Sequence, residues 1–281
     1  MAKRRSRSDS QTSPPLWVPR SLPRRLQDVP LDRLKPDFRP AFLDFDRGIR
    51  MGNLEPNQRI TRILRQALED RHRTHFITDR WGRGVYWQWI CWIPVENRKA
   101  KPVSSAYNFG CAKFYVTLCD DPQGFEAGMQ IERAPVTAAG RVRTQSDWDF
   151  HALVRSLRSG TPLAAEVARL VRQEGFTARA GPFAGQRALA AADYPVPAAL
   201  ARAAKAIPDD AWGGFQLCYV LPRSELRTMT GDDIVAATLA VFDELVPAMN
   251  LVMTVPCLMP PPDRRAAGRK RQPRQPGRGV P

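Results

Sequence analysis

The sequence has few of the residues from which metal and thiol chemistry is built. It contains only three histidines, and its five cysteines include no CxxC pair. Structural zinc sites need four ligands, usually Cys and His in closely spaced pairs, and small disulfide-stabilised domains carry cysteine in pairs. The composition therefore argues against a zinc ribbon and a disulfide scaffold. We predict free thiols, no metal and no bound cofactor.

Common catalytic motifs are also missing. There is no GxxxxGK[ST], GxGxxG, HExxH or GxSxG segment, so the backbone cradles and nucleophile turns that these motifs build are not indicated. One HxxH pair, His72 and His75, lies near the end of a predicted helix, and no second Cys/His cluster accompanies it. We therefore expect these histidines to interact with the helix C-terminus rather than to hold a metal.

Long apolar runs are absent as well. A membrane-spanning helix needs about 20 consecutive apolar residues, and the longest apolar stretch, 234–253, is interrupted by Asp243, Glu244, Pro247 and Asn250. The basic start is not followed by the apolar segment of a secretory signal. These absences predict a soluble, cytoplasmic protein that does not bind membranes.

The charge of the chain is concentrated at its two ends. Of the net charge of +15, residues 1–40 contribute +6 and residues 261–281 contribute another +6. Both segments are rich in arginine and proline, which favours disorder, and arginine-rich tails bind polyanions by releasing counterions. We predict a disordered basic tail over 1–40 and another over 260–281. Between them, 41–135 forms a helix and an antiparallel meander, and 136–259 a mostly helical remainder of the same globular unit.

Apolar periodicity predicts the elements between the tails. In 56–73, Ile60, Ile63, Leu64, Ala67 and Leu68 form one stripe of a helix whose other faces carry arginines. From residue 85 the period changes to two, which predicts strands over 85–94, 111–119 and 125–133. The second half predicts a linker or loop over 134–145, a helix capped by Ser146 and ending at Gly160, and helices after Thr161, near 197–207 and after Thr230, with one strand over 214–221. Separate runs of strands and helices favour an α+β fold with an antiparallel sheet of at least three to four strands.

Four of the seven tryptophans lie within residues 81–92. Strict alternation along 85–94 sends Trp87 and Trp89 to a buried face, beside Phe114 and Met129, and turns Trp92 with Tyr86 to the opposite, polar face. The sequence therefore predicts two structural tryptophans and one outward-facing tryptophan.

The polar face of the predicted sheet is the candidate site. If Leu118 pairs with Phe125, Tyr115 lies over Gly128, and Lys113 is diagonal to Glu132, a pairing that predicts an ion pair on a solvated face. An exposed face of this kind stacks bases or a small planar ligand while basic side chains meet phosphates. The alternative is that helices pack on this face and bury its aromatic residues. The polar loop 96–108 is either a further contact segment or simply solvated.

These features predict a non-enzymatic protein that binds DNA or RNA through its tails, the polar sheet face and the loop. One alternative is a protein-interaction or assembly module with solubilising tails and an acidic partner. The other is a metal-dependent nucleic-acid-processing enzyme using Asp120, Asp121, Glu126 and Glu132. The predicted contact residues are Arg80, Arg83, Tyr86, Gln88, Trp92, Arg98, Lys99, Lys101, Lys113, Tyr115, Arg264, Arg265, Arg269, Lys270 and Arg271.

Overall fold

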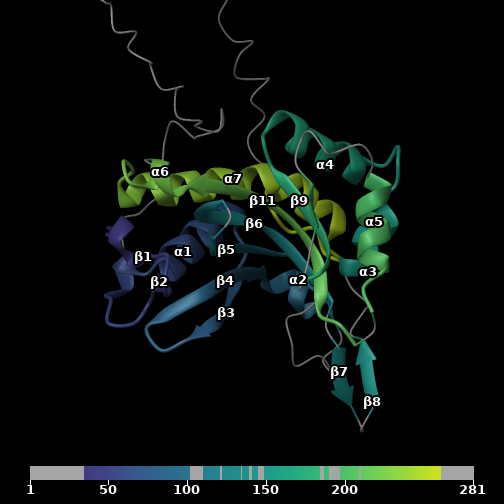
Figure 1. Cartoon of the computed structure of the whole chain (residues 1–281), viewed down its shortest axis with the longest axis horizontal. Coiled ribbons are helices and arrows are strands. Elements are labelled where there is room, and N and C mark those ends of the chain that lie inside the picture. The colour runs from purple at the N-terminus through teal and green to yellow at the C-terminus, as the bar shows by residue number, and fades with distance from the viewer. Residues whose placement is uncertain are drawn as a thin grey trace, which may run out of the picture.

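The computed structural model describes residues 35–101, 110–120, 122–133, 135–138, 141–144, 149–183, 187–189, 197–208 and 210–260. These residues form an α+β fold in which helices pack on a large antiparallel sheet (Figure 1), so the predicted fold class is confirmed. Nearly all of the two predicted tails lies outside the described residues, as does the predicted cap Ser146.

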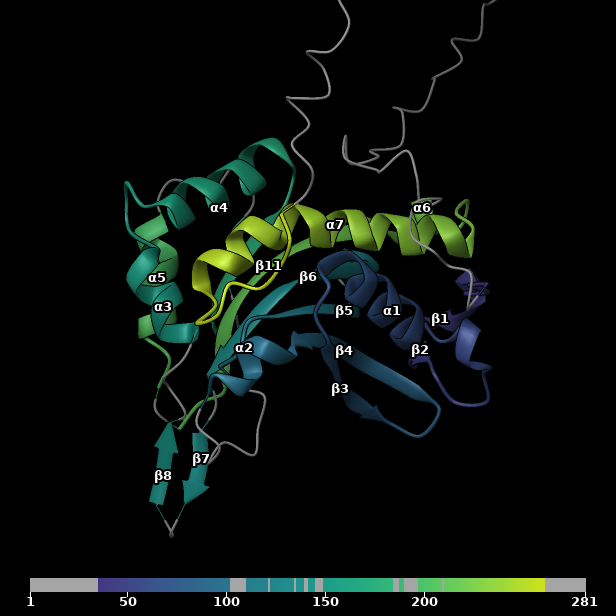
Figure 2. The same cartoon turned by 180° about the vertical axis from the view of Figure 1, so that it is seen from behind.

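The main sheet contains nine strands of the described residues, in the order β1-β2-β4-β5-β6-β11-β9-β10, with β3 paired to β4. Every pairing in it is antiparallel. A separate hairpin, β7 with β8, projects from the body (Figures 1 and 2). The strands are β1 (Leu43–Asp44), β2 (Gly48–Arg50), β3 (Phe76–Arg83), β4 (Tyr86–Pro94), β5 (Lys113–Asp120), β6 (Gln123–Arg133), β7 (Pro135–Ala138), β8 (Arg141–Thr144), β9 (Thr177–Pro182), β10 (Arg187–Leu189) and β11 (Gly213–Pro222).

The helices agree with most of the capping signals in the sequence. Thr161 accepts a hydrogen bond from Ala164 N–H at the start of α4, and Thr230 forms a capping box with Asp233 at the start of α7. The helices are α1 (Ile60–His72), α2 (Val95–Lys99), α3 (Asp149–Ser156), α4 (Pro162–Gln173), α5 (Pro197–Lys205), α6 (Arg223–Leu226) and α7 (Gly231–Val252), with short 3-10 turns η2 (Pro40–Phe42) and η3 (Pro56–Gln58).

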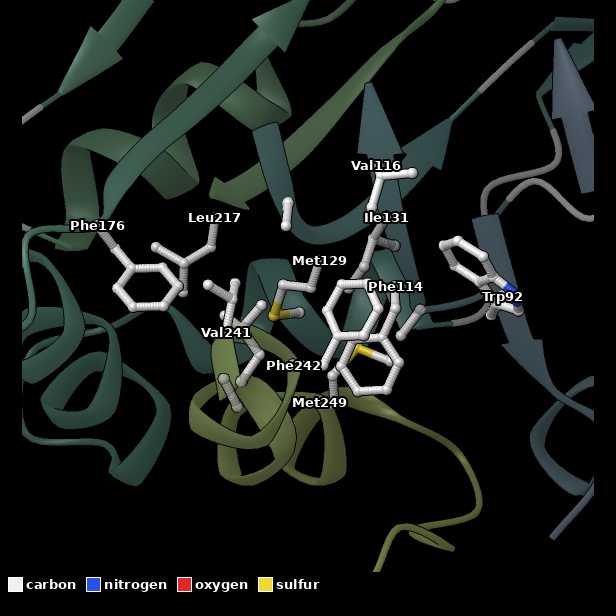
Figure 3. Packing of buried hydrophobic residues seen from close by; sticks show 14 of the residues in the cluster. Trp92, Phe114, Val116, Met129, Ile131, Phe176, Leu217, Val241, Phe242 and Met249 are labelled. Carbon is white, nitrogen blue, oxygen red and sulfur yellow. The ribbon is translucent and has the colours of Figure 1, made fainter. Parts of the chain in front are cut away.

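α7 crosses one face of the sheet and organises the core (Figure 1). Its Phe242 stacks on Phe114 of β5 with ring centroids 4.6 Å apart and lies 5.9 Å from Trp92 of β4 (Figure 3). α1, α3 and α4 pack along α7. The helix continues past Pro247 because Met249 and Val252 beyond it are buried in the same core. α7 is long and apolar enough to cross a membrane, but 67% of its apolar window is buried, as in a core helix.

α1 covers the same face of the sheet beside α7 (Figure 2). The five residues of its predicted apolar stripe are all buried, which confirms that prediction. Trp92 fastens the helix to the sheet, because its indole Nε1–H donates to Thr61 O at 3.1 Å. The arginine-bearing side of α1 is left outside the core.

The tryptophans do not lie as strict alternation predicts. Trp81 pairs with Trp89, but Gly82 pairs with Trp87, so Gln88 is an extra residue in β4. Such a β-bulge reverses the side-chain alternation beyond it. Trp87 and Trp92 therefore share the core face, under the helices, while Trp89 points to the opposite face. The prediction is confirmed for Trp87 and wrong for Trp89 and Trp92.

Several short elements were not predicted. The segment 134–145, expected to be a linker or loop, contains the β7–β8 hairpin, and β3, β9, β10 and α2 carry no clear periodicity in the sequence. β11 lies beside β6. The two stretches 41–135 and 136–259 thus contribute strands to one sheet.

His72 is buried at the end of α1 and is not a charged partner of the helix terminus. The residue is 3% exposed, and its Nδ1 accepts a hydrogen bond from Met259 N–H at 3.1 Å. Burial, with a smaller contribution from the nearby Arg71 charge, lowers the pKa of His72 to about 4. The ring is therefore neutral near pH 7, and the expectation of a charge–dipole interaction is wrong for this residue.

The neutral His72 makes stability depend on pH. The unfolded chain binds a proton at His72 below its ordinary pKa of about 6.5, whereas the folded chain binds it only near pH 4. Stability is therefore lost as the pH falls from about 6.5 toward 4. Between pH 7 and pH 5 we expect this residue to lower the free energy of unfolding by about 2 kcal/mol.

Urea unfolding of the His72→Gln variant at both pH values measures this contribution. The variant should lose about 2 kcal/mol less than the native chain on acidification. His75→Gln is the matched control, because His75 is 82% exposed, and it should behave like the native chain. An equal loss in the native chain and in His72→Gln would contradict the assignment.

Candidate nucleic-acid interface

The polar face, defined as the sheet face opposite α1 and α7, carries a buried network of charged and polar side chains. The register is the predicted one, with Leu118 opposite Phe125, Tyr115 opposite Gly128 and Lys113 opposite Gln130. Its members, however, are not solvated. Lys113, Tyr115, Glu126, Gln130 and Glu132 are each at most 4% exposed.

Glu132 is the centre of one half of this network. Its Oε1 accepts hydrogen bonds from Lys113 Nζ at 2.8 Å and from Gln130 Nε2 at 2.6 Å, and its Oε2 accepts one from Trp212 Nε1 at 3.2 Å. Burial lowers the pKa of Lys113, but the charge and the hydrogen bond of Glu132, together with contributions from Cys91 and Cys111, outweigh the effect of burial, so the net pKa is raised. The predicted ion pair is present, and the prediction that it lies on a solvated face is wrong.

Tyr115 and Glu126 form the other half. The phenol of Tyr115 donates to Glu126 Oε1 at 2.5 Å, and Arg179 of β9 pairs with Glu126 Oε2 at 2.8 Å. Burial raises the pKa of Tyr115 well above its ordinary value, and the Glu126 charge adds to this rise. Trp89 stacks on Tyr115 with centroids 6.4 Å apart. At Gly128 a Cβ would lie 2.6 Å from Leu217 O, so no side chain fits between the strands there.

Lys101 belongs to a second buried cluster, around Asp149. Its Nζ donates to Asp149 Oδ1, while the other carboxylate oxygen accepts from Asn97 Nδ2 and from Ala112 N–H, each at 2.7 Å. Thr254 N–H, beyond α7, also donates to Oδ1 at 2.9 Å. This cluster ties α2, β5, α3 and the C-terminal end of α7 together. The predicted solvent-facing position of Lys101 is wrong, because a buried carboxylate needs a charged partner.

The burial of Lys113 and Glu132 gives a stability prediction. Removing one member of a buried ion pair leaves the other charge uncompensated, at a cost of about 3–5 kcal/mol. We expect Lys113→Met to lower the free energy of unfolding by that amount. The double variant Lys113→Met/Glu132→Gln removes both charges and should recover most of the loss. A loss below about 1 kcal/mol for Lys113→Met would show that water reaches the pair.

A different surface gathers unburied arginines. A groove of about 450 Å³ runs between α1 and the β3–β4 hairpin, and it is lined by Arg59, Thr61, Arg62, Arg65, Gln66, Glu69, Thr78, Arg80 and Trp87. It contains four arginines and a single acidic residue. α1 provides Arg62 and Arg65 from the side opposite its apolar stripe, Arg59 immediately precedes α1, and β3 provides Arg80.

The arginines of the groove make few ion pairs and hydrogen bonds within the described residues. Arg62 is exposed and makes no ion pair among the described residues. Arg59 donates through Nε to Leu54 O at 2.9 Å, and Arg65 pairs with Glu69 at 3.0 Å while remaining 47% exposed. Burial raises the pKa of Glu69, but the hydrogen bonds from Phe76 N–H and Arg65, together with the charges of Arg65 and His75, outweigh the effect of burial, so the net pKa is lowered.

Trp87 gives the groove an aromatic wall. The guanidinium carbon of Arg80 lies 3.8 Å from the centroid of the Trp87 ring, a cation–π arrangement. Trp87 is half-buried because its other contacts lie in the core. The groove thus combines a positive rim with one flat aromatic surface.

No protein-family model, curated protein or solved structure matches this chain.

The structure distributes the predicted contact residues over several places. Arg80 lies in the groove, and Arg83 is exposed at the end of the same strand. Trp92, Lys101, Lys113 and Tyr115 are buried and are not available to a large ligand.

Other predicted contact residues have partners within the protein. Tyr86 is half-buried, with the Arg47 guanidinium carbon 4.3 Å from its ring centroid, and Gln88 Nε2 donates to Arg47 O at 3.1 Å. Lys99 pairs with Glu96 at 3.2 Å. Arg98 lies on α2. Arg264, Arg265, Arg269, Lys270 and Arg271 lie outside the described residues.

Sequence reasoning missed Arg59, Arg62, Arg65 and Trp87 as members of one site. The spacing of three between the arginines is a signal for a single helical row. It does not show what faces that row, because the position of β3 and the direction of Trp87 depend on tertiary packing.

Proposed function

We propose that this protein binds nucleic acid and that the arginine groove, the groove between α1 and the β3–β4 hairpin, contacts the phosphates. The observation that carries the proposal is the convergence of Arg59, Arg62, Arg65 and Arg80 on one groove walled by Trp87. Guanidinium groups present planar donors that match phosphate oxygens, and the Trp87 ring holds the Arg80 guanidinium in the groove through its cation–π contact.

The row of arginines from Arg59 to Arg65 is long enough to contact several phosphates of one nucleic-acid strand. Arg65 lies six positions after Arg59, which corresponds to about 9 Å along a helix axis. One strand of B-form DNA carries about three phosphates over that length. Arg80 faces the row from β3, so a phosphate chain in the groove meets positive charge from both sides.

The buried carboxylates do not favour an enzyme. Glu126 and Glu132 are held by Tyr115, Arg179 and Lys113, and the described residues place no three His, Cys, Asp or Glu side chains where they could share a metal. Asp120 is exposed at the end of β5, and Asp121 is outside the described residues. No observation favours an assembly module.

The five cysteines are free thiols, which supports the cytoplasm as the compartment.

The double variant Arg62→Ala/Arg80→Ala tests the groove. In the full-length chain we expect weaker binding to an oligonucleotide, because two phosphate contacts are lost. The plot of log K against log salt should become shallower by about 1.5, since each phosphate contact contributes about 0.7–0.9 to its slope. Fluorescence anisotropy over a salt series measures both quantities.

Arg155→Ala/Arg202→Ala is the matched control. It removes two exposed arginines from α3 and α5, which lie at the other end of the sheet (Figure 1). Any binding through the tails is the same in both variants. The proposal fails if the two double variants bind alike, or if the native chain does not bind oligonucleotides.

A further inference from the structure

Trp81 is the most exposed large apolar residue of the described chain. It is 64% exposed on β3 of the β3–β4 hairpin and makes no ring contact with another described aromatic side chain. A tryptophan in water is unfavourable because its large apolar surface stays hydrated. The exposure of Trp81 leaves most of its ring accessible to a ligand.

Trp81 adjoins the arginine groove in the chain but points the other way. Arg80 pairs with Ile90, whose side chain lies in the core under the helices, and it lines the groove. Trp81 pairs with Trp89, on the polar face. Successive residues of a strand point to opposite faces, so Arg80 and Trp81 stand about 3.8 Å apart at their Cα atoms and face opposite sides.

β3 is an edge strand, which leaves a path between these two side chains. Within the described residues it pairs only with β4. A ligand that fills the groove and also reaches Trp81 passes around this free edge. It has to turn sharply within the thickness of one strand.

We infer that the nucleic acid is single-stranded, with phosphates in the arginine groove and a base stacked on Trp81 across the edge of β3. This inference rests on the proposed function. A duplex is stiff, with a persistence length of about 150 base pairs, and its bases are already stacked on each other. A single strand turns freely and presents every base to an aromatic ring. Only a single strand uses both Arg80 and Trp81.

The test compares oligo-dT of about 20 nucleotides with a duplex of the same length, using the full-length chain at about 0.15 M salt. Trp81→Ala should lower the affinity for oligo-dT at least about fivefold and leave the affinity for the duplex unchanged. Trp81→Phe should keep most of the affinity, because a smaller aromatic ring still stacks. Leu251→Ala is the control, since Leu251 is a large apolar residue of α7 that is 41% exposed and does not line the groove.

The outcomes separate this inference from the proposed function. If Arg62→Ala/Arg80→Ala weakens binding while Trp81→Ala weakens oligo-dT and duplex equally or neither, the inference is overturned and the proposed function stands. If Arg62→Ala/Arg80→Ala changes binding to neither oligonucleotide, both are overturned. A thermal melt of each variant establishes that the fold is intact.

Discussion

The extra residue at Gln88 sets the direction of Trp87 relative to the other tryptophans of the β3–β4 hairpin. Because β4 carries this bulge, Trp87 turns toward α1 and Trp89 turns to the polar face, although the two are separated by a single residue. Trp87 then forms the wall on which Arg80 rests, opposite the arginines of α1. Without the bulge Trp87 and Trp92 would lie on opposite faces of β4, and the groove would lose its aromatic wall.

Burial divides the charges of the protein into two groups with different roles. Lys113 and Lys101 are buried and Arg179 is half-buried, and each is matched by a buried carboxylate, namely Glu132, Asp149 and Glu126. Such pairs hold elements together, because an unmatched charge there is costly. The arginines of the groove lie at the surface, where desolvation costs little and a partner is not required. They remain available to a polyanion for that reason.

The sequence predicted the features that depend on local periodicity. The apolar stripe of α1, the caps of α4 and α7 and the pairing of β5 with β6 follow from repeats and turn residues a few positions apart. The pairing register of β4 with β5 does not follow from such local signals, because more than ten residues join these two strands and leave their relative register open. The bulge at Gln88 has no local signature either. The outward-facing prediction for Trp92 failed for these reasons.

The candidate site could be predicted only in its chemistry. The sequence predicts basic side chains beside aromatic rings, and Arg80 belongs both to the predicted set and to the groove. Tertiary packing decides which other residues line the groove.

Ultraviolet cross-linking of oligo-dT to the full-length chain, with the linked peptides located by mass spectrometry, tests directly whether the arginine groove and the β3–β4 hairpin contact nucleic acid. We predict cross-links within residues 59–92, at α1 and the β3–β4 hairpin. Cross-links confined to 1–34 and 261–281 would contradict it.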